Sequence, residues 1–168
     1  MEINRIWAMP NKNTFTIKPI RELVNRYSED SNFSIDPFAN SNKIATFRND
    51  LDPQYETEYR MDALDFLKKW DNNMFDLVLF DPPYSPRQVS ECYKLLNKTV
   101  NMKTTQSSFW GNIKKEISRI TEKNGIVITC GWNSGGIGKS NGFEIEEILI
   151  IPHGGWHNDT IVTVERKL

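Results

Sequence analysis

Residues 75–84, with the sequence FDLVLFDPPY, constrain the fold more than any other part of this chain. Residues 77–80 are apolar, β-prone and free of turn formers, which is typical of a strand buried on both faces. Pro82 and Pro83 cannot donate backbone hydrogen bonds, so the strand must end at Asp81. The segment predicts a carboxylate, carbonyl acceptors and the Tyr84 ring at one strand end, a set that suits an amino group on a flat ring. A strand that simply ends in a proline turn is the alternative.

The length and composition favour one globular domain. The chain has 168 residues, of which residues 1–13 show no periodicity and are expected to form an extended N-terminal arm. No apolar run approaches the roughly 20 residues that a membrane span needs, and the N-terminus lacks a signal-peptide core, so we expect a cytoplasmic protein. The two cysteines, Cys92 and Cys130, predict neither a disulfide framework nor a metal site.

Charge is distributed unevenly along the chain, although the formal net charge is only −1. Residues 28–62 contain eight acidic and three basic side chains, whereas residues 86–123 contain eight basic and three acidic ones. The second segment is either a phosphate-contacting surface or a solvated helix face. The small net charge alone argues weakly against a free-standing nucleic-acid-binding protein.

Helical and strand patterns alternate through most of the chain and end in two consecutive strands, which predicts an α/β fold with a mostly parallel sheet and an antiparallel terminal hairpin. A helix should begin at Lys18 and Pro19, because Ile20, Leu23 and Val24 form one apolar stripe. Further helices are expected at 63–70, 89–96 and 109–124. Strands are expected at 33–38, 44–50, 59–62, 77–81, 126–130, 143–152 and 160–167, and residues 131–139 should form a flexible glycine-rich loop.

The first two predicted strands lie too close in sequence for an ordinary parallel connection. Only five residues separate Phe38 from Ile44, whereas a crossover through a helix needs about a dozen. Either this connection is a short loop or the second strand is placed unusually. Asn40 and Asn42 tolerate positive φ and could form a tight loop with outward backbone N–H groups.

Asp81-Pro82-Pro83-Tyr84 resembles the catalytic motif of S-adenosylmethionine-dependent amino methyltransferases, in the form that methylates the N6 atom of adenine. Lys18-Pro19 and Asp36-Pro37-Phe38-Ala39 resemble the cofactor segment of that family, and Asp50 and Asp62 resemble its acidic positions beside ribose and adenine. The resemblance covers roughly residues 15–165. It implies a Rossmann-like class I methyltransferase fold with a shortened cofactor half, in a single domain of residues 1–168.

The resemblance also implies a set of site residues. The catalytic residues would be Asp81, Pro82, Pro83 and Tyr84. S-adenosylmethionine would bind at Phe15, Lys18, Pro19, Asp36, Pro37, Phe38, Ala39, Asn40, Asp50, Asp62 and Ala63. The nucleic-acid substrate, DNA in the first place, would contact Arg87, His153, Trp156 and His157, and no metal is implied.

The implied chemistry agrees with the residue types. A carboxylate such as Asp50 suits the vicinal hydroxyls of ribose. If Asp81 and the Pro82 carbonyl accept the two N–H bonds of an adenine amino group, the nitrogen lone pair turns toward the methyl donor, and Tyr84 would stack on the base. Such a base must leave its helix stack, so the target is flipped or single-stranded.

Two departures from the family pattern leave alternatives open. Asn40 and Asn42 stand where the family has glycines, and no insert is long enough for a target-recognition domain. Residues 86–106 and 153–159, a second copy or a partner subunit would then supply target recognition. The alternative functions are methylation of adenine in RNA, methylation of a protein glutamine, and a non-catalytic role as a subunit or interaction protein.

Overall fold

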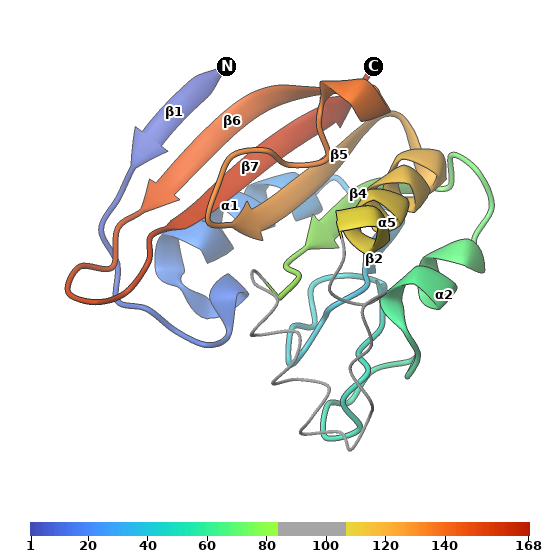
Figure 1. Ribbon diagram of the computed structural model, residues 1–168, viewed down its shortest axis with the longest axis horizontal. Coiled ribbons are helices and arrows are strands. Elements are labelled where there is room, and N and C mark those ends of the chain that lie inside the picture. Colours follow the sequence, from blue (N-terminus) through green and yellow to red (C-terminus); the bar gives the residue numbers. More distant parts are fainter. Residues whose placement is uncertain (84–106) are drawn as a thin grey trace.

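The protein is built around a seven-stranded sheet, seen here in a computed structural model that describes residues 1–83 and 107–168 (Figure 1). The strand order is β1-β6-β7-β5-β4-β2-β3. β7 runs antiparallel to β5 and β6, and the other ladders are parallel. The strands are β1 (Glu2–Arg5), β2 (Ser34–Asp36), β3 (Phe47–Arg48), β4 (Phe75–Phe80), β5 (Thr121–Gly131), β6 (Phe143–Ile151) and β7 (Thr160–Lys167).

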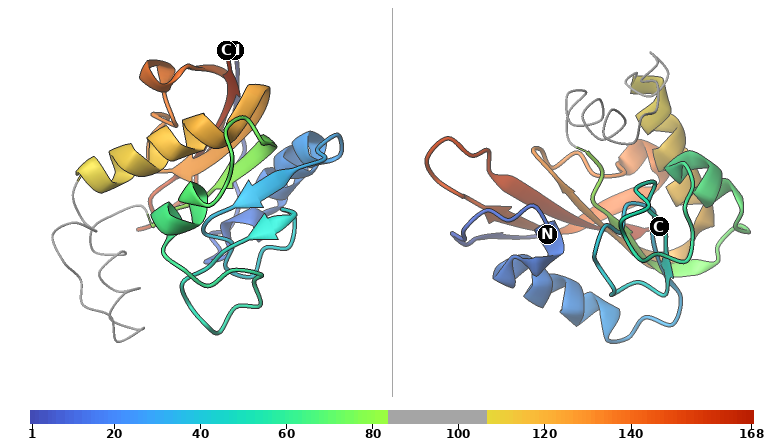
Figure 2. Two further views of the ribbon diagram at one scale, coloured as in Figure 1. Left: turned by 90° about the vertical axis from the view of Figure 1, so that its right-hand side faces the viewer. Right: turned by 90° about the horizontal axis from the view of Figure 1, so that it is seen from below.

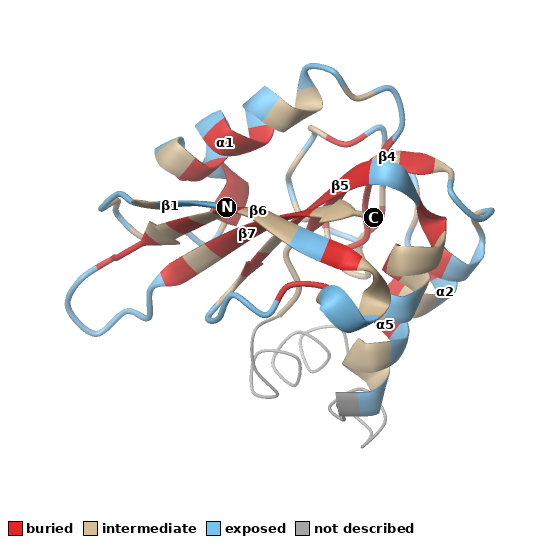
Figure 3. Ribbon diagram, turned by 90° about the horizontal axis from the view of Figure 1, so that it is seen from above, coloured by how far each residue is buried: buried red, intermediate tan, exposed pale blue. Residues whose placement is uncertain are grey.

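Helices cover both faces of this sheet, which confirms the predicted α/β fold with an antiparallel terminal hairpin (Figure 2). α1 lies on one face, and α2 and α5 lie on the other (Figure 3). The α-helices are α1 (Lys18–Ser28), α2 (Ala63–Lys68) and α5 (Ser107–Ile120), and two short 3-10 helices are η1 (Thr14–Thr16) and η2 (Lys139–Asn141). In the described residues no helix combines the length and the apolar character that a membrane span requires. The helix predicted at 89–96 lies outside the described residues.

β4 forms the centre of the molecule because both of its faces are buried. Leu77 and Leu79 pack in the core on the α1 face, whereas Val78 and Phe80 pack in the core beneath α2 and α5. This alternation follows from the two-residue period of a strand. The predicted buried strand is therefore present, and it spans residues 75–80 instead of 77–81.

α1 begins as the sequence predicts, with Pro19 in its first turn. Proline is favoured there because its missing N–H would have no helical partner. Ile20, Leu23 and Val24 form the buried stripe of the helix and lie against the sheet. Because α1 leads into the amino end of β2, its own first turn lies toward the carboxyl ends of the parallel strands.

The N-terminal arm is not a separate extension, because part of it forms the edge strand β1. Glu2 to Arg5 pair in parallel with residues 147–150 of β6, and the pairing continues through hydrogen bonds from Ile6 N to Ile150 O (3.0 Å) and from Ala8 N to Pro152 O (3.3 Å). Sequence periodicity missed this strand since its side chains are mostly exposed. Edge pairing depends on the neighbouring strand rather than on a local pattern.

The prediction that a helix extends to residue 124 is wrong. α5 ends at Ile120, and β5 begins at Thr121, which pairs with Phe75 of β4. The ladder then shifts register before Leu77 pairs with Ile126. Asn124 has a φ of 65°, so it turns the chain within this irregular part of β5 rather than capping the helix.

The half of the sheet that contains β2 and β3 is reduced to short strands and loops. β3 has two residues, and Tyr59 adds only an isolated parallel bridge to Asn49. Residues 37–46 and 50–58 contain no helix. The predicted strands at 44–50 and 59–62 are therefore much shorter than expected, whereas the short-loop connection is confirmed.

Candidate active site

Three carboxyl groups gather where neighbouring parallel strands end. Asp36 is the last residue of β2, Asp50 lies two residues beyond β3, and Asp81 directly follows β4. The carboxyl ends of parallel strands meet at one sheet edge, where open α/β sheets bind their ligands. The charges of Asp81 and Asp50 both act on the Asp36 carboxyl. The structure therefore brings these three predicted site residues together.

The Asp36 carboxyl is completely buried. Its Oδ1 accepts a hydrogen bond from Phe38 N (3.0 Å), and its Oδ2 accepts one from Asn42 Nδ2 (3.2 Å). Burial raises the pKa of Asp36 from 3.8 to about 8, the Phe38 bond opposes this shift, and the negative charge of Asp81 adds to it. Asp36 consequently holds its proton at neutral pH.

Asp50 closes the loop that follows β2. Its Oδ2 accepts a hydrogen bond from Asn40 N (2.8 Å) and its Oδ1 accepts one from Asp52 N (2.9 Å). Burial raises the pKa of Asp50, and these two backbone bonds lower it. Each carboxylate oxygen has a further lone pair, so Asp50 can still receive a hydroxyl group.

Asn40 and Asn42 have different roles in this loop. Asn40 has a φ of 51°, so it supplies the left-handed turn that glycine would otherwise make. The side-chain amide of Asn42 instead donates a hydrogen bond to Asp36. The predicted tight turn is present, but the Asn40 N–H points to Asp50 rather than outward. Pro37 and the buried Ala39 complete the turn.

A buried side chain, Asn49, connects the two loops of this half of the sheet. Its Nδ2 donates to Pro37 O (3.1 Å) and Met61 O (2.9 Å), and its Oδ1 accepts from Met61 N (3.0 Å). Its backbone N–H also donates to Asp36 O (2.9 Å). Sequence analysis missed Asn49, since an asparagine near a strand end resembles an ordinary turn residue.

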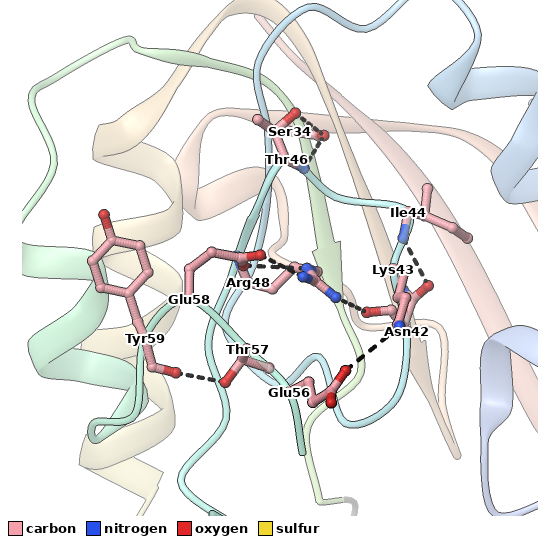
Figure 4. A network of polar contacts seen from close by, with 10 residues as sticks. All are labelled: Ser34, Asn42, Lys43, Ile44, Thr46, Arg48, Glu56, Thr57, Glu58 and Tyr59. Carbon is pink, nitrogen blue, oxygen red and sulfur yellow. Dashed lines mark hydrogen bonds and ion pairs between the residues drawn. The ribbon is translucent and has the colours of Figure 1, made fainter.

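Polar contacts of Arg48 join the same loops nearer the surface (Figure 4). Its guanidinium pairs with the Glu58 carboxylate, and its Nη1 donates to Asn42 O (3.4 Å). Lys43 and Glu56 form a second ion pair (3.8 Å), but both side chains are exposed, so it contributes little stability. The Arg48 contacts therefore set the loop spacing more than the exposed pair does.

Asp81, Pro82 and Pro83 form a partly exposed corner at the end of β4. Burial raises the pKa of the Cys130 thiol on the next strand, and the charges of Asp81 and Asp36 raise it further. Among the described residues, no donor hydrogen-bonds to the Pro82 carbonyl. Tyr84 and Arg87 lie outside the described residues.

Aromatic side chains line the interior beneath this corner. The ring centroid of Phe38 lies 6.0 Å from that of Phe80 and 6.1 Å from that of Trp110. The loop after β2 thus packs directly on the last residue of β4. This contact couples the position of the Asp36 loop to that of Asp81.

The remaining predicted cofactor residues lie in two other places. Asp62 caps α2 by accepting a hydrogen bond from Leu64 N (2.9 Å), and Ala63 is buried in the first turn of that helix. Phe15 packs in the core on the α1 face, and Lys18 is exposed beside Glu22. Lys18 and Pro19 open α1 as predicted.

The predicted substrate residues of the β6–β7 hairpin divide into one buried and two exposed side chains. His153 is buried at the base of the hairpin, and its ring nitrogens contact Ala8 O and Thr160 Oγ1, each at 2.8 Å. The ring of His153 is therefore part of the hairpin's internal structure. Trp156 and His157 are exposed.

The glycine-rich loop after β5 is anchored at its far end, rather than flexible throughout. Glu165 of β7 is completely buried and accepts hydrogen bonds from Ile137 N (2.6 Å) and Gly138 N (2.8 Å). Burial raises the pKa of Glu165, and these bonds oppose the shift. A side chain on Gly136 would collide with the Glu165 carboxylate. The signal in the sequence was a lone acid within an apolar strand.

No protein-family model and no curated protein sequence matches this chain. Solved structures with the same fold do exist. Burkholderia thailandensis 1,6-didemethyltoxoflavin-N1-methyltransferase, solved with 1,6-didemethyltoxoflavin and S-adenosylhomocysteine, has a TM-score of 0.61 and 11% identity over 89% of this chain and 77% of that chain. N-methyltransferase NodS from Bradyrhizobium japonicum has a TM-score of 0.58 and 10% identity over 94% of this chain and 99% of that chain.

TrmN from Thermus thermophilus is also similar, with a TM-score of 0.57 and 15% identity over 90% of this chain. The alignment covers 49% of TrmN, so this chain matches about half of that protein. At these identities the similarity shows a shared fold. The predicted class I methyltransferase sheet is therefore confirmed.

Replacing Asn49 with alanine should destabilise the protein by about 3 kcal/mol, because it removes one buried and two partly buried hydrogen bonds and leaves backbone groups of Pro37 and Met61 without these partners. The free energy of unfolding from urea titration measures the effect. Asn25→Ala, on the exposed surface of α1, is the matched control and should change stability by less than about 0.5 kcal/mol. A similarly small effect for Asn49→Ala would contradict the structural role of this side chain.

Asp36 should make the protein less stable as the pH rises from about 4 to about 8. The folded state keeps the Asp36 proton through this range while the unfolded state loses it, so stability is fully present below pH 4 and falls toward the folded pKa. Asp36→Asn should make the decline in unfolding free energy shallower by up to about 1.4 kcal/mol per pH unit. Asp30→Asn, an exposed control, should leave the slope unchanged; an unchanged slope in Asp36→Asn would show that Asp36 ionises normally.

Proposed function

We propose that this protein transfers a methyl group from S-adenosylmethionine to the N6 amino group of adenine in DNA. The observation that carries the proposal is the convergence of Asp36, Asp50 and the Asp81-Pro82-Pro83 corner at one edge of a class I methyltransferase sheet. In this arrangement the loop after β2 would hold the cofactor, and the residues after the neighbouring strand β4 would accept the hydrogen bonds of an amino group.

The donor set at the ends of β2 and β3 fits S-adenosylmethionine. Asp50 has lone pairs for the ribose hydroxyls, and the acidic surroundings of Asp36 favour a ligand that carries a sulfonium and an ammonium group. The turn at residues 37–40 and the Asp62 cap would border the nucleoside, and Phe15, Lys18 and Pro19 the opposite side. When bound, S-adenosylmethionine supplies an activated methyl group.

The acceptor chemistry would come from the end of β4. The Asp81 carboxylate and the Pro82 carbonyl can each accept one N–H bond of an exocyclic amino group. Holding both hydrogens turns the nitrogen lone pair away from the ring, which raises its availability for the methyl group. Asp81 and Pro82 would thus position the amino group and stabilise the charge that develops on its nitrogen.

Similar structures favour nitrogen as the methyl acceptor. Two of them carry N-methyltransferase in their names, and one of these was solved with a heteroaromatic compound bound. The hairpin side chains Trp156 and His157 are exposed at the same sheet edge and could contact a flipped or single-stranded nucleotide. Adenine in RNA offers the same amino group, so the polymer is one of the variables in the experiment below.

A non-catalytic subunit is the second candidate. One observation favours it: the carboxyl oxygens of Asp36 already bind Phe38 N and Asn42 Nδ2 of this chain. A cofactor that needed those oxygens would have to compete with them. Calorimetric titration with S-adenosylmethionine separates the two candidates, because a non-catalytic subunit of this kind would show no binding.

Asp81→Ala should lower methyl transfer by about 100-fold or more, because one of the two acceptors for the amino group is lost. S-adenosylmethionine affinity should change less than about threefold. The measurement is tritiated methyl transfer onto genomic DNA and total RNA in parallel, followed by nucleoside analysis, which identifies the polymer and the base.

Asp65→Asn on the exposed side of α2 is the matched control and should keep wild-type turnover. Retained turnover in Asp81→Ala would place the chemistry elsewhere. Labelling of RNA alone, or of a base other than adenine, would overturn the stated substrate.

A further inference from the structure

A pocket of about 340 Å³ lies beyond the Asp81 corner along the same sheet edge. Three segments form it: residues 10–14 of the arm that follows β1, Trp132 after β5, and the β6–β7 hairpin with Trp156 and His157. β1, β5 and β6 run in the same direction, so all three segments emerge where these strands end. Figure 1 shows the arm and the hairpin at one side of the sheet.

Two hydrogen bonds join the arm to the hairpin. Ala8 N donates to Pro152 O (3.3 Å), and His153 Nδ1 contacts Ala8 O (2.8 Å). A carbonyl oxygen can only accept, so His153 Nδ1 is the donor. His153 Nε2 contacts Thr160 Oγ1 (2.8 Å) in the same pocket wall. The pocket is thus built before any ligand arrives, which lowers the entropy cost of binding.

The side chains that line the pocket favour a negatively charged ligand. None of them is acidic, although the chain contains 22 aspartates and glutamates. Lys12 lies in the lining, is exposed, and has no ion-pair partner within the described part of the chain. Asn11 and Asn158 add amide groups that can donate hydrogen bonds. A phosphate suits this environment, whereas a cationic cofactor does not.

Two indole rings supply the second element of recognition. Trp156 is fully exposed, and Trp132 is 42% exposed. Exposed tryptophans in a single pocket are typical of surfaces on which bases of unpaired nucleic acid stack. The chemistry of the pocket is therefore that of a nucleotide, with a flat ring and an anionic phosphate.

We propose that this pocket binds a nucleotide of the substrate strand that flanks the target adenine, with its base on Trp156 and its phosphate near Lys12. This inference rests on the proposed function. The pocket flanks the Asp81 corner because Trp132 follows β5, and β5 is the strand next to β4. The N-terminal arm thereby takes part in holding the substrate.

The test is fluorescence anisotropy of the whole protein with a labelled, adenine-containing single-stranded oligonucleotide of about 12 nucleotides. Trp156→Ala should weaken binding between about 5-fold and about 100-fold. Lys12→Ala should also weaken binding, and should lower the slope of log affinity against log salt by about 0.7, the value for one phosphate contact. Lys68→Ala, an exposed lysine on α2, is the matched control and should change neither quantity.

The outcomes separate this inference from the proposed function. Unchanged oligonucleotide affinity and salt slope in a Lys12→Ala/Trp156→Ala double variant would overturn the inference, even if methyl transfer is normal. A parallel loss of S-adenosylmethionine affinity, measured by calorimetry, would also overturn it, because the pocket would then belong to the cofactor. If the wild type binds the oligonucleotide through this pocket but binds no S-adenosylmethionine, nucleotide binding by the pocket stands, whereas the proposed function and the position beside a target adenine are both overturned. Circular dichroism of each variant confirms folding.

Discussion

The side-chain amide of Asn49 is the interaction on which the half of the sheet that contains β2 and β3 depends. β3 has only two residues, and the connections before and after it contain no helix, so only a few backbone hydrogen bonds fix these loops. Asn49 adds to that support by bonding to Pro37 O and to both backbone groups of Met61. A buried amide with all of these partners specifies one loop arrangement, because any other would leave polar groups unpaired.

That arrangement brings the buried Asp36 near Asp50 and Asp81. Asp36 cannot leave the interior without breaking its bonds to Phe38 and Asn42. Burial raises the pKa of Asp36 most, and the negative charges of Asp81 and Asp50 raise it further. A cationic ligand beside Asp36 would offset the nearby negative charge and favour loss of the Asp36 proton. The reduced loops thus form an acidic environment at the ends of β2 and β3.

The parts of the fold that the sequence predicted are those determined by local patterns. The apolar run before Asp81 and the stripe that begins at Lys18 each follow from neighbouring residues. β1, the early end of α5 at Ile120, and the Glu165 anchor depend on partners far away in the sequence. Asn49 belongs to the same group, since its partners lie 12 residues away on either side. Tertiary contacts decided these features.

The strand order places two environments of different charge at one edge of the sheet. β4 lies between β2, which carries Asp36, and β5, which leads to Trp132. The acidic side chains therefore lie on one side of Asp81, and the acid-free pocket with Lys12 lies on the other. A sulfonium donor and a phosphate-bearing acceptor placed in these two environments would meet at the end of β4. Pro82 and Pro83 follow the central strand between these two environments, and they cannot donate bonds that would extend its ladder.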